Sequence, residues 1–465
     1  MNPMRLSLRL SLPATRWIAA LLLAGAGGSF PARAASVPTQ EIDLATALQL
    51  AGARSLDLQM AKKRVAEAYA QKSAAYLQFA PTLFAGASYR RHDNLIQNIE
   101  GQIIEADRVA WSYGPSLSLQ VDTGDALFKA LAAKQQARAA VFAEESQRQE
   151  SLLLAATAFF DLLHAKAAAT VSGAAMQISA DYLRQVETAV AAGIAFRGEE
   201  LRVKVQHERD QLALRQSQEA AQIASARLVQ ILHLQPGTLL DSKSPLLPID
   251  FVSKDQPLEK LLSEAGARRP EARLSAAQIA AAQHARSGAL YGPLLPTVSG
   301  LASIGVLGGN IQGERSRSGE SADYQIGVGW RIGPGGLFDP SRTQAANARL
   351  ALSELSAEKV RDEIGRQVME GWARTRSLSD QIQIAHRAVE AARQTLELTR
   401  DRREFAVGNV LEVIVSAQEL SRARLEWIRL VADHNKAQFL LNRAVGGTPP
   451  EAPSAAAAAA KKTSK

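Results

Sequence analysis

The 465-residue sequence contains no cysteine. This absence excludes disulfide staples, thiolate metal sites and a lipid-modified cysteine behind a signal sequence. A membrane attachment of the mature chain would therefore have to come from its fold. Aromatic residues are also scarce, at 5% of the chain, so a local cluster of them is informative.

Motifs for enzymatic chemistry are missing as well. The seven histidines are scattered, without an H-E-x-x-H pair, and there is no G-x-S-x-G turn. The stretch "GPGG" at 333–336 lacks the Lys-Ser/Thr of a phosphate loop and instead suits a turn from a strand into a helix. We therefore predict no catalytic residue, no cofactor and no metal site, and an enzyme is the least favoured function class.

The sequence has little net charge away from its ends. Of the formal +8, four arginines in residues 1–34 supply +4 and the tail 448–465 supplies a net +2, which leaves +2 for the rest. Such a weak excess does not form a phosphate-binding surface. We expect no nucleic-acid partner.

Long apolar runs are also absent, apart from one near the N-terminus. Arg5, Arg9 and Arg16 precede or flank the run "WIAALLLAGAGG", and "PARAAS" follows with Ala32 and Ala34 in a small-x-small arrangement. This pattern predicts a signal peptide over residues 1–34 that is removed on export. The run is shorter than the roughly 20 residues of a membrane-spanning helix, and we expect no such helix later in the chain.

The sequence contains an internal duplication. Three landmarks recur in one order at separations of 215, 215 and 210 residues: Pro81-Thr82 with Pro296-Thr297, Gly193 with Gly408, and Leu127-Phe128 with Leu337-Phe338. They predict a first repeat over residues 35–245, a second over 246–447, and a disordered tail over 448–465. Each repeat reads as a helix of about 35 residues, a strand, a polar loop, a second strand, a very long helix, a glycine turn and another long helix.

The long helices carry heptad patterns. Between residues 128 and 190 there is no proline and one glycine, among many helix-forming residues. Farther along, apolar residues recur every seven positions, which indicates coiled-coil packing against neighbouring helices. His434 lies in this seam, so we interpret it as a packing residue. The seam consists of Val413, Leu420, Trp427, His434 and Leu441, with Ala423, Leu430, Ala437 and Ala444 beside it.

The strand segments alternate in polarity. In "SLSLQV" the polar set is Ser116, Ser118 and Gln120, and in "YQIGVGWRI" it includes Gln325 and Arg331. Alternation of this kind suits a half-buried soluble sheet, and it equally suits a membrane barrel that is apolar outside and polar within. In the barrel interpretation these five residues face the lumen.

The surroundings of the strands favour the barrel. Seven aromatic residues gather at or near the strand segments, as in an interfacial girdle: Tyr76, Tyr89, Trp111, Tyr113, Tyr291, Tyr324 and Trp330. Four strands cannot close a barrel, and open sheet edges do not occur in lipid. Several chains must then share one barrel, and a trimer would supply twelve strands and twelve long helices. Replacing Leu83 or Val298 with a charged residue should impair membrane assembly only if that position faces lipid. Small residues line both sides of these two strands, so the sequence leaves open which face of the sheet each residue is on.

These features together resemble the TolC family of outer-membrane efflux proteins, over residues 42–447. The specific marks are the duplicated Pro-Thr pair that opens a strand, the turns "AAGIAFRGEEL" and "AVGNVLEVI", and the closing "LLNRAVGG". The resemblance implies mixed α and transmembrane β structure: a trimeric twelve-stranded outer-membrane barrel, four strands per chain, continuous with a long periplasmic helical barrel. It implies docking to a periplasmic adaptor and an inner-membrane transporter in efflux or type I secretion, in a Gram-negative bacterium.

The resemblance also assigns residues at the hairpin tips. Gly193 and Gly408 match the turn glycines at the periplasmic aperture, where the family contacts its adaptor. Glu199, Glu200 and Glu412 match the region of acidic residues inside the aperture. They either form a cation-attracting ring or are solvated acids at helix starts, where the helix dipole favours them.

The second turn departs from the family pattern. It is about two residues shorter, Val415 replaces an acid, and Phe405 stands where some members have tyrosine, so a hydroxyl latch is not expected there.

Passive conduction to the cell exterior is the predicted function. The alternative is a secreted periplasmic coiled-coil scaffold or adaptor without a pore, which explains the heptads but not the alternating strands. Two polar segments, 92–108 and 305–322, are predicted to be extracellular loops. The sequence does not identify the exported substrate.

Overall fold

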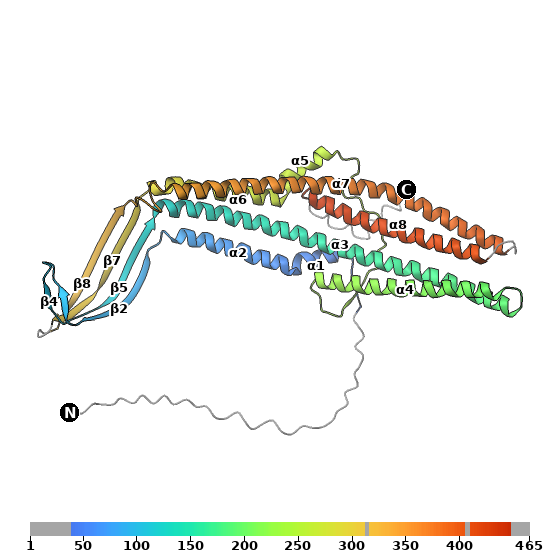
Figure 1. The fold of residues 1–465 in the computed structure, drawn as a ribbon, viewed down its shortest axis with the longest axis horizontal. Helices are drawn as coiled ribbons and strands as arrows, with labels where there is room; N and C mark the ends of the chain where they lie inside the picture. The colour runs from blue at the N-terminus through green and yellow to red at the C-terminus, as the bar shows by residue number, and fades with distance from the viewer. Residues whose placement is uncertain (1–38, 312–315, 405–409, 448–465) are drawn as a thin grey trace, which may run out of the picture. The chain divides into compact units, whose positions relative to one another are not determined.

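The computed structural model describes residues 39–311, 316–404 and 410–447. Every described element belongs to one compact unit that begins at Thr39. One order of elements occurs twice along it (Figure 1). The first copy comprises α1 (Leu44–Arg54), α2 (Leu56–Leu77), β2 (Thr82–His92), β5 (Arg108–Asp122), α3 (Thr123–Ala191) and α4 (Arg197–Ile231). The second comprises α5 (Leu258–Arg268), α6 (Pro270–Tyr291), β7 (Thr297–Ile311), β8 (Arg317–Gly329), α7 (Pro340–Glu404) and α8 (Val410–Ala444).

The opening helix of each copy is broken in two, contrary to the single helix of about 35 residues predicted from the sequence. Ser55, with ψ of 124°, ends α1, and its hydroxyl accepts the Leu58 N–H at 3.3 Å to start α2. Arg269 ends α5 with ψ of 127°, and Pro270 then starts α6. Proline fits this position because the N–H of the first helical residue has no acceptor within the helix, so a residue without an N–H loses no hydrogen bond there. Both breaks replace a continuous rod with a kinked pair.

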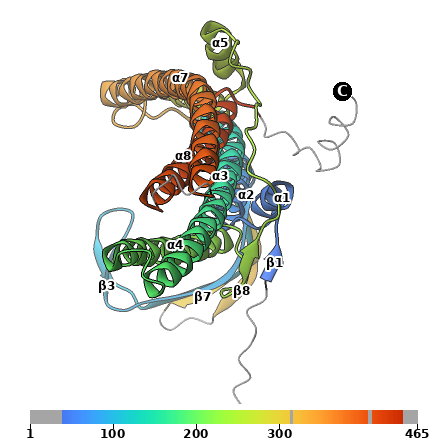
Figure 2. The ribbon, with the colours of Figure 1, turned by 90° about the vertical axis from the view of Figure 1, so that its right-hand side faces the viewer.

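The helices form a single layer of four at each level. Near the strands the order of contact is α2, α3, α6, α7, and toward the helix turns it is α4, α3, α8, α7. In Figure 2 the four helices of the second set form a curved row. The long helices α3 and α7 belong to both levels, as 69 and 65 residues allow.

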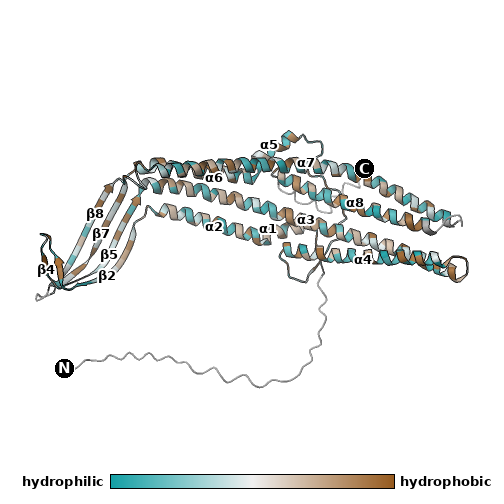
Figure 3. Ribbon diagram, viewed as in Figure 1, coloured by the Kyte–Doolittle hydropathy of each residue, from teal (hydrophilic) through white to brown (hydrophobic). Residues whose placement is uncertain are grey.

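The predicted heptad seam of α8 is confirmed. Most of its residues are buried, with exposed fractions of 0% for Val413, 4% for Leu420 and 2% for both His434 and Leu441, whereas Ala423 and Trp427 are partly exposed. The Nε2 atom of His434 lies 3.1 Å from an oxygen of Asp250. Near the turns the seam meets Tyr182 and Val186 of α3, so the two helical hairpins share one core. Hydrophobic and hydrophilic residues alternate along the helices (Figure 3).

One helix is more apolar than we predicted. By length and composition α3 qualifies as a candidate membrane span, and 44% of its most apolar stretch is buried within the protein. The prediction that no segment after residue 34 is apolar enough to span a membrane was therefore wrong as a statement about composition. Packing accounts for its composition, because α1, α2, α4, α6 and α8 all contact this helix.

The segment that links the two copies lies against α8 and is held by buried amides. The Asn435 side chain accepts the Ile249 N–H and donates to the Leu247 carbonyl, both at 2.9 Å. Gln438, 1% exposed, accepts the N–H groups of Phe251 and Val252 at 3.2 and 3.0 Å. Before this segment, β6 (Leu239–Asp241) pairs in parallel with β1 (Thr39–Glu41). These bonds satisfy backbone groups that would otherwise be buried without partners.

The main sheet has four antiparallel strands in the order β2, β5, β7, β8. Most of the predicted loop 305–322 is in fact strand, since β7 continues to Ile311 and β8 starts at Arg317. The predicted loop 92–108 contains a small hairpin, β3 (Leu95–Gln97) paired with β4 (Ile103–Glu105). Because β8 ends at Gly329, Arg331 lies outside the strand that was predicted to contain it.

Candidate functional site: the two-faced sheet and the helix turns

The strand register sorts the side chains of the sheet into two unlike faces. Directly paired residues share a face, and the face alternates along each strand. Ser118 pairs with Thr82 and Leu301, and Leu301 pairs with Gln325. This face, here called the polar face, consists mainly of small, polar and charged residues. It includes Ser88, Arg90, Ser112, Ser116, Ser118, Gln120, Asp122, Thr297, Ser299, Ser303, Asp323 and Gln325, with Phe84, Leu301 and Leu307 as exceptions.

The opposite face is apolar. Leu83 pairs with Leu117, which pairs with Ala302, which pairs with Tyr324. Many of these side chains are exposed within the single chain, for example Leu83 at 70% and Ile326 at 87%. The register also settles the face that the sequence left undecided, because Val298 pairs with Val121 and Val328 and so joins Leu83 on the apolar face.

The apolar face has the height of a membrane. On β5 it extends from Trp111 to Val121, and Trp111 stacks on Tyr113 with ring centroids 5.9 Å apart. Such a segment, tilted as barrel strands are, rises roughly 25–30 Å, which matches the apolar band of outer-membrane barrels. Tyr89, which pairs with Trp111, extends the aromatic border to the sheet edge.

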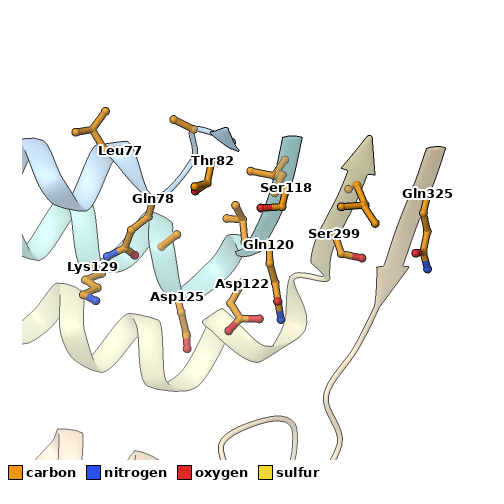
Figure 4. A pocket seen from close by; sticks show the side chains of 16 residues that line it. Leu77, Gln78, Thr82, Ser118, Gln120, Asp122, Asp125, Lys129, Ser299 and Gln325 are labelled. Carbon is orange, nitrogen blue, oxygen red and sulfur yellow. The ribbon is translucent and has the colours of Figure 1, made fainter. Parts of the chain in front are cut away.

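A hollow of about 790 Å³ lies where the polar face meets the helices (Figure 4). Gln120, Ser299 and Gln325 point to the same side of the sheet in this view. Ser118 also lines the hollow, whereas Ser116 lies farther along the polar face. Four of the five predicted lumen residues therefore lie on one face of the sheet. The fifth, Arg331, lies beyond the end of β8.

Ion pairs fix the junction between strands and helices. Asp122 accepts the Thr297 hydroxyl at 2.6 Å and lies 3.7 Å from Arg331. One turn into α3, Asp125 pairs with Arg342 of α7. A side chain at Gly124 would collide with Gly292, so the first turn of α3 packs directly on the backbone of η1 (Gly292–Leu294). The carboxylates at this end of the sheet are thus neutralised by arginines.

The "GPGG" turn joins β8 to α7, as predicted. Gly333 and Gly335 adopt φ of 108° and 77°, which favours glycine. Asp339 then caps the helix by accepting the Ser341 hydroxyl and the N–H groups of Gly335 and Arg342. These hydrogen bonds, the one from Ser341 first, lower the pKa of Asp339 to about 2.

Gly193 lies in the turn between α3 and α4, where the sequence predicted a glycine turn between two long helices. This residue has φ of 75°, its N–H bonds to the Val190 carbonyl at 3.0 Å, and the Ile194 N–H bonds to the Ala189 carbonyl at 2.8 Å. The pattern is a Schellman cap, for which glycine is the usual residue. The turn exposes Ile194 and Phe196 at 82% and 84%. An apolar tip of this kind suits contact with another protein.

The predicted acidic residues lie at helix starts beside these turns. Glu199 and Glu200 are half-buried in the first turn of α4. Glu412 is in the first turn of α8, 3.8 Å from Arg402. Gly408 and Phe405 lie outside the described residues. Both interpretations of the acids, a ring or solvated helix starts, remain predictions. In the described part of the chain no group of three or more His, Asp or Glu could hold a metal.

A sheet with one polar and one membrane-sized apolar face, joined to paired helical hairpins, is the protomer fold of an outer-membrane channel. The sequence model for outer membrane efflux proteins matches residues 47–233 and again 261–447. The chain therefore belongs to the outer membrane efflux protein family, a family of transport proteins and not of enzymes. This confirms the resemblance to TolC-like proteins, and the double match reflects the internal duplication. No curated protein matched the chain.

Solved structures agree on the fold. A membrane protein from Pseudomonas aeruginosa is 18% identical with a TM-score of 0.75, over 88% of this chain and 92% of that one. The outer membrane protein VceC from Vibrio cholerae is 17% identical with a TM-score of 0.72, over 87% and 96%. The CmeC outer membrane channel of Campylobacter jejuni is 14% identical with a TM-score of 0.74, over 90% and 89%. At these identities the likeness concerns the fold alone.

Proposed function

We propose that three copies of this chain form an outer-membrane channel that conducts solutes from the periplasm to the exterior. The three sheets close one twelve-stranded barrel, and the helix layers close a periplasmic tunnel of twelve helices at each level. The observation that carries the proposal is the sheet, whose two faces suit water on one side and lipid on the other.

The edges of the sheet support closure by neighbouring copies. Within the described residues, β2 and β8 each pair with one strand only, on their inner side. Their free N–H and C=O groups would be costly in lipid, and pairing β2 of one copy with β8 of the next removes that cost. Antiparallel alignment of Thr82 with Gly329, the helix-side ends of the two strands, would place Leu83 opposite Val328.

The helix layer has matching edges. At one edge α7 exposes Leu352, Leu355 and Leu398 at 62–64%. At the other, α2 exposes Leu56 at 52% and α4 exposes Leu212 at 59%. Contact between copies along these edges would bury this apolar surface.

The helix turns are the proposed docking site for the partners. The exposed Ile194 and Phe196 would contact a periplasmic adaptor, which in turn connects to an inner-membrane transporter. Gly193 and the acids Glu199, Glu200 and Glu412, together with Gly408 and Phe405, would line the aperture. The scaffold without a pore is the weaker candidate, because it gives no role to the apolar sheet face.

Planar lipid bilayers test the conduction directly. We expect discrete conductance steps after addition of the purified protein, and larger steps when Glu412 and its neighbours are substituted, since the aperture would then open. If neither the natural protein nor the aperture variants conduct, although both form heat-resistant trimers, the proposal is wrong.

A further inference from the structure

Four basic side chains gather at one end of the polar face, at the end far from the helices. His92 pairs directly with Arg108, and the adjacent row of the sheet runs from Arg90 through Ala110 and Gly309 to Arg317. Arg90 and Arg317 thus occupy the two free edges of the sheet, with Arg108 between them. An open hollow of about 510 Å³ is lined by both Arg108 and Arg317. This group is not apparent from the sequence, in which residues 92–108 and 305–322 look like loops.

Within residues 39–311, 316–404 and 410–447, Arg90, Arg108 and Arg317 form no ion pair. Of the nearby carboxylates, Asp93 pairs with Arg91 at 2.8 Å. Asp107 accepts the neutral Asn94 N–H at 2.9 Å, which does not cancel its charge, so Asp107 offsets part of the positive field of the three arginines.

Other acids of the sheet are distant or lie on the other face. Glu320 belongs to the apolar face, because it pairs with Val306. Asp323, on the polar face, is six residues along β8 from Arg317, roughly 20 Å away. The opposite end of the sheet differs, because its acids Asp122 and Asp125 are paired with Arg331 and Arg342.

The position of the group is the outer rim of the lumen. Arg90 follows Tyr89, whose row with Trp111 is the outer aromatic border of the apolar face. In a trimer the three arginines of each chain would give nine guanidinium groups around the mouth. Like charges this close repel one another, so the cluster costs stability and gains nothing from packing.

We infer that this basic ring makes the outer mouth of the channel selective for anions, so that anionic solutes leave more readily than cationic ones. The inference rests on the proposed function. Rings of Arg or Lys favour anions in pores because their field raises the local anion concentration. The ring acts in the opposite sense to the acids at the helix turns.

The reversal potential in a KCl gradient measures this selectivity. We expect the natural channel to pass chloride in preference to potassium, and the Arg90→Gln, Arg108→Gln, Arg317→Gln triple variant to lower that ratio by about twofold or more. In water, one unit charge about 4 Å from an ion changes the local concentration of that ion by about fivefold. A greater distance and screening by salt both reduce this factor. The effect should grow at 10 mM salt, where the Debye length is about 30 Å, and vanish near 1 M.

The Arg91→Gln, Asp93→Asn double variant is the matched control, because it removes a neighbouring ion pair without changing the net charge, and Arg91 faces the apolar side. Its ratio should equal that of the natural channel. Equal ratios in the triple variant and the natural channel would overturn the inference.

Chemical modification avoids variants that fail to fold. The chain has no cysteine, so Arg317→Cys can be labelled in assembled, conducting channels. A cationic thiol reagent should restore the anion preference that is lost with Arg317, and an anionic reagent should lower it further. If both reagents leave the ratio unchanged, the ring does not govern selectivity. Channels that conduct without anion preference would refute this inference alone, whereas a protein that never conducts would refute the proposed function.

Discussion

A charge placed on the apolar face should prevent stable insertion, and Leu117→Arg is the most informative change. Leu117 is on the central strand β5, six residues from Trp111 and four from Val121, near the middle of the apolar band. On the lipid face an arginine near the bilayer midplane costs about 2–4 kcal/mol. Since each trimer would carry three such arginines, the total cost reaches about 6–12 kcal/mol, comparable with the whole stability of a folded domain.

The adjacent Ser116→Arg is the control. Ser116 is on the polar face and pairs with Ser303, so its arginine would reach water in the lumen at little cost. The assay is refolding into liposomes followed by gel electrophoresis with and without heating, which separates folded trimers from unfolded chains. Leu117→Arg should reduce the folded fraction strongly and Ser116→Arg should leave it near that of the natural protein. Equal behaviour of the two variants, or a reversed order, would refute the assignment of the faces.

Three further predictions concern the periplasmic part. Gln438→Ala removes the acceptor of two buried N–H groups and should lower the free energy of unfolding by about 2–4 kcal/mol, whereas the exposed Gln381→Ala should change it little in the same denaturant titration. Burial raises the pKa of Glu271, but the Arg269 charge and hydrogen bonds outweigh it and lower the pKa below 4.5. A carboxyl group with a lowered folded-state pKa stabilises the fold above its unfolded pKa and loses this contribution as the pH falls, so melting temperatures of Glu271→Gln should fall less steeply below about pH 4.5 than those of the natural protein. Gly193→Ala should cost roughly 1 kcal/mol from the left-handed backbone alone, because no atom lies within 4 Å of the added methyl group; an unchanged unfolding curve would argue against this turn.

Periodicity predicted the helices well, because long runs of one period leave few alternatives. The α8 seam at Val413, Leu420 and Leu441 is buried as its spacing indicated. The sequence did not reveal the break at Ser55, since a single capping serine inside a helical pattern looks like an ordinary helix residue. Burial of Asn435 and Gln438 was equally hidden, because their backbone partners come from a segment about 185 residues away.

The strands were predicted less completely. Glycine-rich and polar stretches such as 305–311 read as loops, yet they belong to β7, where small residues on the polar face need no apolar partner. The face of Leu83 and Val298 could not be read from their own strands, because small residues flank both. Only the cross-strand register, with Leu117 and Val121 as partners, decides it. The basic ring has the same origin, since Arg90 and Arg317 are 227 positions apart and share a row only in the sheet.

Cross-linking of neighbouring copies tests the central claim most directly. Because the natural chain lacks cysteine, a Leu83→Cys, Val328→Cys double variant can form disulfides only through these two positions, which lie at opposite edges of the four-stranded sheet. A barrel shared by three copies predicts covalent trimers on non-reducing denaturing gels of membrane fractions, and monomers for either single variant. The control variants combine Leu83→Cys with a cysteine at position 326 or 330, which allows for a shifted register. If these variants and the Leu83→Cys, Val328→Cys variant all stay monomeric under oxidation, the three sheets do not close one barrel.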